Sequence, residues 1–230
     1  MLTQNTRLNK HLALQLGISR READDLIASG TVTVNDQIVS LGARVLPQDV
    51  IMIAGAPVDT DGVSFRYIAL NKPVGYVCSK RKQGQSDTIY SLLPPELRTL
   101  KSVGRLDRNS SGLLLLTNDG DFTQRMTHPS YKKTKVYHVR LDHDLEPLHQ
   151  QMISDFGIQL DDGHSQLSLA KMSEHNRTEW QVTMAEGRNR QIRRTFAALG
   201  YNVTRLHRVQ FGNYSLGEIP RGTYKIINIS

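Results

Sequence analysis

The segment from Gly104 to Gly120, GRLDRNSSGLLLLTNDG, places one acidic side chain among arginines, between two apolar runs. Asp107 lies between Arg105 and Arg108, and small hydroxylated residues and a glycine follow it. A carboxylate at the end of a strand can act as a nucleophile or a general base, and nearby cations favour its ionised form. The same pattern is typical of a turn in which Asp107 is a capping residue and the arginines are solvated. The pattern alone leaves both interpretations open.

A second charged segment, EGRNRQIRR from Glu186 to Arg194, packs four arginines into seven positions. It opens a predicted helix over 188–199, in which Ile192 faces the core. Arg193 then lies beside the apolar face, where a guanidinium could pair with a buried carboxylate and lower its pKa. The alternative is that all four arginines are solvated surface charges on one helix.

An aromatic candidate, Tyr137, lies in the alternating run KVYHV and should share a strand face with Lys135 and Val139. Its ring could stack on a nucleobase, which is worth about 1–3 kcal/mol. A tyrosine in such a run is also a common component of a sheet core, and the two interpretations are compatible.

These segments resemble the motifs of a known enzyme family. GRLD, a small hydroxylated residue and GLLLLTNDG together resemble the catalytic motif of the pseudouridine synthases, in particular the RsuA/RluB branch that acts on ribosomal RNA. Three further segments resemble that branch's opening strand and turn, tyrosine motif and third motif: YIALNKPVGYVCS (67–79), KTKVYHV (133–139) and EGRNRQIRR (186–194). Residues 6–53 resemble an S4 RNA-binding domain, so the resemblance covers nearly the whole chain.

The resemblance implies that the chain isomerises a specific uridine of ribosomal RNA to pseudouridine, without a cofactor. It assigns catalysis to Asp107, with attack on the base or on the sugar both open. It also implies that Arg193 pairs with this carboxylate and that Tyr137 stacks on the uracil, with Ile192 in the same uridine-binding group. Arg105 would fill the space left by the flipped base; its alternative is a solvated arginine at a strand end.

Basic residues near two predicted helix starts could bind RNA phosphates, since the free N–H groups of a helix N-terminus favour anions. These residues are Arg7, Lys10, Arg20 and Arg21. We expect a basic surface on the second part of the chain to extend this contact, through Lys132, Lys133, Lys135, Arg205 and Arg208. Each could equally be an ordinary surface charge.

The elements that position these residues form an α+β fold, in which a small S4-type ααβ domain (1–53) precedes a catalytic domain (65–230) with a mostly antiparallel mixed sheet. In the first part, Leu8, Leu12 and Leu16 line one helical face, and Ser19 with Glu22 predicts a capping box opening a second helix. Strands are predicted at 31–34 and 50–53, with a turn at Asn35-Asp36. The turn-rich segment 54–64, AGAPVDTDGVS, is predicted to be a linker.

The second part alternates strand and helix patterns, and several strands lack an intervening helix, which favours antiparallel pairing. The predicted strands are 67–70, 76–79, 100–106, 113–117, 135–141, 166–171, 179–185 and 203–210. The predicted helices are 121–127, 145–155 and 188–199. The polar segment 80–87, KRKQGQSD, is predicted to be a mobile loop.

Composition limits the classes of function. The chain has 230 residues, a formal net charge of +7 and one cysteine, Cys78. The basic excess favours a polyanionic partner, and the single cysteine excludes an intrachain disulfide. No apolar run reaches the roughly 20 residues that span a bilayer, the first residues lack the apolar core of a signal peptide, and no metal-ligand spacing is present. We therefore expect a cytoplasmic monomer without metal; the rival hypothesis is a non-catalytic S4-type ribosomal RNA-binding or assembly protein.

Overall fold

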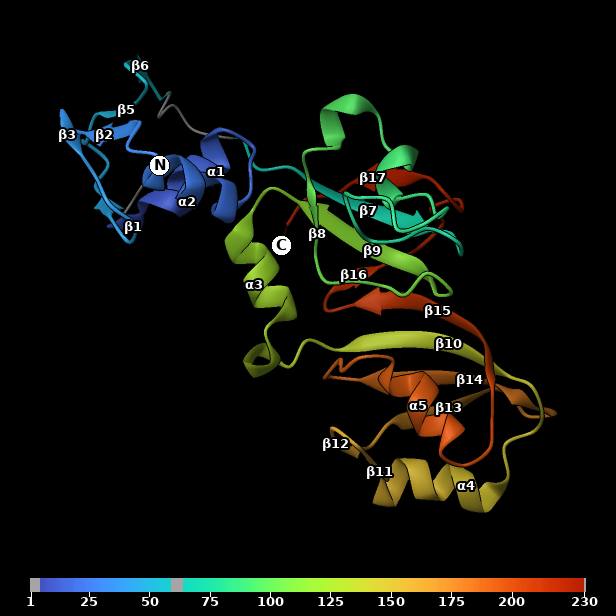
Figure 1. Ribbon diagram of the computed structural model, residues 1–230. Coiled ribbons are helices and arrows are strands. Elements are labelled where there is room, and N and C mark those ends of the chain that lie inside the picture. The colour runs from blue at the N-terminus through green and yellow to red at the C-terminus, as the bar shows by residue number, and fades with distance from the viewer. Residues whose placement is uncertain (1–4, 59–63, 230) are drawn as a thin grey trace. The chain divides into compact units, whose positions relative to one another are not determined.

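The computed structural model describes residues 5–58 and 64–229. The chain divides into two compact units, Met1–Arg66 and Tyr67–Ser230, which Figure 1 shows with their elements. Among the described residues, no helix is both long and apolar enough to cross a membrane.

The first unit has two helices, a four-stranded antiparallel sheet in the order β3-β2-β5-β6, and a separate pair β1-β4. The elements are β1 (Thr6–Arg7), α1 (Leu8–Gln15), α2 (Arg20–Ala28), β2 (Val32–Val34), β3 (Gln37–Ile38), β4 (Arg44–Val45), β5 (Ile51–Ile53) and β6 (Ala56–Pro57). One apolar cluster joins the two helices to the sheet, with Leu8, Ala23 and Ile51 among its members.

Local sequence signals explain most of this unit. The capping box is confirmed: Ser19 Oγ accepts from the Glu22 backbone N–H at 3.1 Å, and Glu22 Oε2 accepts from the Ser19 N–H at 2.6 Å. Asn35 and Asp36 both adopt positive φ, the conformation of a tight turn between β2 and β3. Leu8 and Leu12 are fully buried as predicted, but Leu16 is 43% exposed because α1 ends at Gln15.

The first part of the range predicted as a linker, 54–64, contains a β-strand. Ala56–Pro57 forms β6 and pairs with β5, so the sheet of the first unit continues into that range. Residues 59–63 of the range lie outside the described residues.

The second unit is built on a nine-stranded sheet with the main order β13-β14-β10-β15-β9-β7-β17; β16 pairs with β15, and β8 with β9. Its strands are β7 (Tyr67–Lys72), β8 (Lys101–Ser102), β9 (Ser111–Thr117), β10 (Lys135–Leu141), β13 (Ser168–Ser173), β14 (Asn176–Met184), β15 (Val203–Phe211), β16 (Tyr214–Ser215) and β17 (Tyr224–Ile226); β11 (Ile158–Leu160) and β12 (Gly163–Ser165) form a separate hairpin. Every pairing in this sheet is antiparallel except β9 with β15. The predicted α+β class with a mostly antiparallel mixed sheet is confirmed.

Both faces of this sheet are covered along β9, which explains its continuous apolar run. Leu114 and Leu116 join the larger core, with Phe196 of α5 (Gln191–Ala197). Leu113 and Leu115 join a second core, with Phe122 of α3 (Gly120–Thr127). Figure 1 shows α3 and α5 beside different parts of the sheet.

Of the predicted strands, one does not form and another is much shorter than predicted. The range 76–79 contains only an isolated bridge, Val77 to Thr88, because its backbone bonds to a loop instead of a neighbouring strand. Of the range 100–106, only β8 forms, since the chain turns at Gly104, which has φ +71°. In the segment 80–87, predicted to be a loop, the structure has one further bridge, Gln83 to Ser86.

Two predicted helices are also corrected. The helix predicted over 145–155 begins at Pro147 as α4 (Pro147–Gln151) and widens into a π-helical turn, Met152–Phe156. The helix predicted over 188–199 begins later, at Gln191, because Arg190 adopts a left-handed conformation with φ +47°. Arg188 and Arg190 are therefore loop residues, and the four arginines do not share one helix.

Candidate active site

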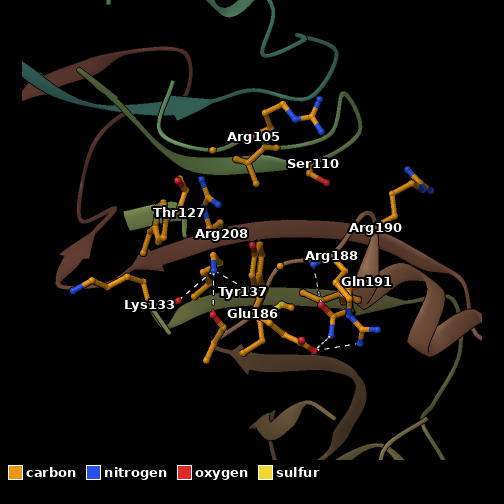
Figure 2. A pocket seen from close by; sticks show the side chains of 18 of the residues that line it. Arg105, Ser110, Thr127, Lys133, Tyr137, Glu186, Arg188, Arg190, Gln191 and Arg208 are labelled. Carbon is orange, nitrogen blue, oxygen red and sulfur yellow. Dashed lines mark hydrogen bonds and ion pairs between the residues drawn. The ribbon is translucent and has the colours of Figure 1, made fainter. Parts of the chain in front are cut away.

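A pocket in the second unit is lined by residues from five separate parts of the chain (Figure 2). Four of the five predicted site residues of this unit line it: Arg105, Asp107, Tyr137 and Ile192. The fifth, Arg193, does not line the pocket and instead donates to the Asn109 carbonyl in the loop that carries Asp107. The fold thus brings together residues that the sequence separates by more than half of the second unit.

Asp107 lies in the tight loop between Leu106 and β9. Its side chain is 36% exposed, and its Oδ2 lies 3.6 Å from Nη1 of Arg190. The Ser110 N–H donates to the Asp107 carbonyl at 3.0 Å, which closes the turn. The carboxylate therefore faces a pocket, with a cation beside it and access for a substrate.

Lys72, the last residue of the buried strand β7, holds the loop that carries Asp107 in place. This lysine is fully buried, and its ammonium donates to the carbonyl oxygens of Pro73, Asp107 and Ser110 at 3.0, 3.1 and 2.8 Å. All three N–H donors are thus used on the backbone. Burial lowers the pKa of Lys72 to about 8, against its ordinary value of 10.5.

Tyr137 lies at the centre of the pocket on β10. It is 8% exposed and packs in the main core, so the sheet-core interpretation holds for its ring body. Figure 2 shows Ser110 and Arg190 on one side of it, and Thr127 and Lys133 on the other. Tyr137 also lines the pocket, so a ligand bound there would contact its side chain.

Ile192 and Arg105 have different surroundings. Ile192 is 4% exposed and belongs to the same apolar cluster as Tyr137, so it forms part of the pocket's apolar wall. Arg105 is exposed at the rim, and Figure 2 shows its guanidinium directed away from Tyr137.

The predicted ion pair between Arg193 and Asp107 is not formed. Arg193 Nη2 donates to the Asn109 carbonyl at 2.8 Å and Nη1 to the Val203 carbonyl at 2.6 Å. The helix begins later than predicted, so Arg190, and not Arg193, reaches the carboxylate. Burial and the nearby Arg190 lower the pKa of Arg193, and Asp107 raises it, so the three charges remain electrostatically coupled.

The loop 186–190 is held by Asp162, in the turn between β11 and β12. Arg194 donates to both of its carboxylate oxygens, at 3.0 and 2.6 Å, and Arg188 Nη1 donates at 3.0 Å. Glu186 accepts from Arg188 and from Gln191. This network fixes the loop that carries Arg190.

Other basic residues lie differently from the expectation. Arg208 is only 2% exposed, and Lys135 is half-buried and donates to the carbonyl oxygens of Lys133, Ala185 and Glu186. Arg208 is therefore not part of the basic surface that we predicted from the sequence. Lys132 and Arg205 are exposed, and Lys133 is half-buried like Lys135.

In the first unit, three of the four predicted RNA-binding residues are exposed. Arg7 precedes the first residue of α1, and Arg20 and Arg21 open α2. Lys10 is half-buried within α1. The phosphate contact expected at the start of α2 stays a prediction.

Sequence reasoning missed Lys72, Arg190, Arg208 and Asp162 as components of the site. A lysine that ends an apolar strand, as Lys72 does in YIALNK, is a signal that could have been recognised. Asp162 gives no such signal, because its role depends on two arginines that lie 26 and 32 positions away. Among the described residues, no group of three or more His, Cys, Asp or Glu side chains is placed to hold a metal ion.

Comparison with known proteins identifies relatives of this chain. A family model for RNA pseudouridylate synthase matches residues 66–198, and one for the S4 domain matches residues 6–51. The chain is 36% identical to a ribosomal small subunit pseudouridine synthase A of Yersinia pestis, over 95% of this chain and 93% of that protein. It is 37% identical to a ribosomal large subunit pseudouridine synthase B of Pseudomonas aeruginosa, over 95% of this chain and 58% of that protein.

Among solved structures, a crystal structure of pseudouridylate synthase is 32% identical, with a TM-score of 0.69, and the match covers 97% of this chain and 96% of that one. The family model, the near-complete relatives and the shared structure lead to one conclusion. This chain belongs to the RNA pseudouridylate synthase family and carries an S4 domain.

Proposed function

We propose that this protein isomerises a specific uridine of ribosomal RNA to pseudouridine, with Asp107 as the catalytic residue. The observation that carries the proposal is that the Asp107 carboxylate, Tyr137 and Arg190 line one pocket. Relatives named for modification of the small and the large ribosomal subunit support ribosomal RNA as the substrate.

The reaction exchanges one bond for another. The N1–C1′ glycosidic bond breaks, the freed uracil rotates, and a C5–C1′ bond forms. The C5 hydrogen leaves as a proton and N1 takes up a proton, so the product is an isomer of uridine. The exchange is redox-neutral overall, so the chemistry requires no electron carrier. Asp107 supplies a carboxylate that can attack C6 of the base or act at C1′ of the sugar.

The neighbouring residues then have supporting roles. The edge of Tyr137 supports the extruded uracil against the wall formed by Ile192. Arg190 supplies a positive charge beside the Asp107 carboxylate, and Arg193 holds the loop that carries Asp107 through its bond to the Asn109 carbonyl. The exposed side chain of Arg105 takes the position in the RNA base stack that the flipped uracil has left.

The first unit contributes affinity for RNA through Arg7, Lys10, Arg20 and Arg21. The matches at 6–51 and 66–198 support an RNA-binding domain at 1–53 and a catalytic domain at 65–230. The segment 54–64 joins them, and its strand β6 extends the sheet of the first unit. We further propose that the protein acts as a monomer. Ribosomal RNA as substrate supports a cytoplasmic site of action.

The test is tritium release from ribosomal RNA transcripts labelled at C5 of uridine. The wild-type protein should release tritium to a single-site limit, and Asp107→Asn should abolish release while RNA binding is retained. Asp144→Asn, which changes an exposed carboxylate outside the pocket, is the matched control and should keep full activity.

Two outcomes would count against the proposal. Activity of Asp107→Asn would show that the catalytic residue is elsewhere. Tight RNA binding by the wild-type protein, without release from either ribosomal RNA, would favour the non-catalytic RNA-binding hypothesis.

A further inference from the structure

Arg208 is a buried cation whose hydrogen-bonding capacity is largely unused. It is 2% exposed; its Nε donates to the Leu113 carbonyl at 2.8 Å, and its Nη2 is shielded from solvent with no partner. Within the described part of the chain, no carboxylate forms an ion pair with it. Lys72, the other fully buried cation near the pocket, uses all three of its donors. A buried charge without compensation is costly, so this contrast needs a reason.

The fold fixes the position of this guanidinium. Arg208 pairs with Tyr137 across β10 and β15, so both side chains emerge on the same face of the sheet. Its Cζ lies 4.8 Å from the centre of the Phe211 ring, and Figure 2 shows it beside Tyr137, on the side of Thr127 and Lys133. The guanidinium is thus held by a carbonyl and a ring, and it lines the pocket that holds Asp107.

The charges around it indicate what it would bind. The two carboxylates that line the pocket, Asp107 and Glu186, each have another arginine as partner. Lys135 Nζ lies 5.3 Å from the centre of the same Phe211 ring that Arg208 contacts, and Lys133 also lines the pocket. The missing component is therefore an anion with several acceptor oxygens.

We propose that Arg208 binds a phosphate group of the substrate RNA next to the flipped uridine. This inference rests on the proposed function and adds to it a fixed anchor for the nucleotide's backbone. A phosphodiester supplies the negative charge and the two oxygen acceptors that a guanidinium fork matches. A uracil carbonyl would supply one acceptor without charge, and would leave the buried cation uncompensated. The contact between Arg208 and the phosphate fixes the distance from the RNA backbone to Asp107. The flipped uracil therefore enters the pocket in one orientation.

The test uses the salt dependence of tritium release from C5-labelled ribosomal RNA transcripts. One lost phosphate contact reduces the slope of log affinity against log salt concentration by about 0.7–0.9. Arg208→Gln should raise KM at least about tenfold and reduce the slope of log kcat/KM by that amount. Arg208→Lys keeps the charge, and its slope should stay at the wild-type value. Arg140→Gln, an exposed change on the opposite face of β10, is the control and should match the wild type.

A second measurement does not depend on the variant folding. In a synthetic RNA that the wild-type protein modifies, one phosphate next to the target uridine is replaced by a neutral methylphosphonate. With the wild-type protein, a methylphosphonate at one of the two neighbouring linkages should raise KM about as much as Arg208→Gln does. Combined with the variant, it should have no further effect.

The outcomes separate the two claims. If the wild-type protein releases no tritium from any ribosomal RNA, the proposed function fails. If it releases tritium, but neither methylphosphonate raises KM, the phosphate anchor is wrong. An Arg208→Gln loss confined to kcat, with an unchanged salt slope, would instead assign this side chain to the uracil or to the protein's own structure.

Discussion

Arg190 places its Nη1 3.6 Å from Oδ2 of Asp107, although it lies in a loop and not on the neighbouring helix. Arg193, three positions later, points to the backbone of the same loop and donates to the Asn109 carbonyl. One arginine thus faces the carboxylate, and the other holds the segment that carries it. The two substitutions should consequently have different effects.

Arg193→Ala should lower kcat by about a hundredfold while RNA affinity changes little, because a displaced catalytic loop costs about that much. Arg190→Gln should cost about fivefold or less, since a half-exposed ion pair contributes about 1 kcal/mol at most. Single-turnover tritium release gives the rates, and filter binding gives the affinities. If Arg193→Ala weakened binding alone, its role in holding the Asp107 loop would be wrong.

Lys72→Met should destabilise the protein by at least about 2 kcal/mol, because three buried carbonyl oxygens lose their donor. It should also remove a pH dependence. Burial lowers the pKa of Lys72 to about 8, so between pH 8 and 10.5 the unfolded chain holds a proton that the folded chain has released. Rising pH therefore favours folding at this site.

The measurement for Lys72 is urea unfolding of the wild type and of Lys72→Met across this pH range. The difference in unfolding free energy between them should grow as pH rises. Parallel pH curves for the two proteins would show that Lys72 carries the same proton in both states.

Asp162→Asn should loosen the loop 186–190, because Arg188 and Arg194 lose their shared carboxylate. Exposed ion pairs contribute little to global stability, so the melting temperature should change only slightly. We expect faster amide hydrogen exchange in the loop and a lower kcat. Asp161→Asn, at the adjacent exposed carboxylate, serves as the control; equal effects of the two substitutions would exclude a specific clamp.

Gly112→Ala should unfold the centre of the sheet. Gly112 has φ +101°, and an added Cβ would lie 2.2 Å from the Arg208 carbonyl oxygen across the parallel pair β9–β15. We expect a loss of at least about 3 kcal/mol. Gly200→Ala isolates the conformational strain, since Gly200 has φ +89° with nothing within 4 Å, and it should cost about 1 kcal/mol. Similar losses at both positions would mean that β9 and β15 can separate freely.

The double substitution Arg20→Gln/Arg21→Gln should weaken RNA binding without changing kcat. If each arginine contacts one phosphate, the salt slope of binding should fall by up to about 2. Arg44→Gln, in the same unit but bonded to the Asn5 carbonyl, is the matched control. A normal slope for the double variant would place the RNA contact of this unit elsewhere.

The features that the sequence determined by itself are those encoded by neighbouring residues. The capping box at Ser19 and Glu22 involves groups three positions apart, and the apolar run of β9 follows from its burial on both faces. The motif around Asp107 likewise indicated the family before any coordinate, and the assignment of catalysis to Asp107 stays a prediction. Where a short segment bonds outside its own neighbourhood, as at 76–79, the same local reasoning predicted a strand that does not form.

Tertiary structure alone decided which cation serves which acceptor. The bond from Arg193 to Asn109 joins residues 84 positions apart, and that from Arg208 to Leu113 joins residues 95 apart. Because Arg190 adopts a left-handed conformation, α5 begins only at Gln191. Asp107 therefore pairs with Arg190 and not with Arg193, the partner predicted from the sequence. Arginines are alike in sequence, and their pairing depends on direction and burial, which are fixed only when distant strands meet.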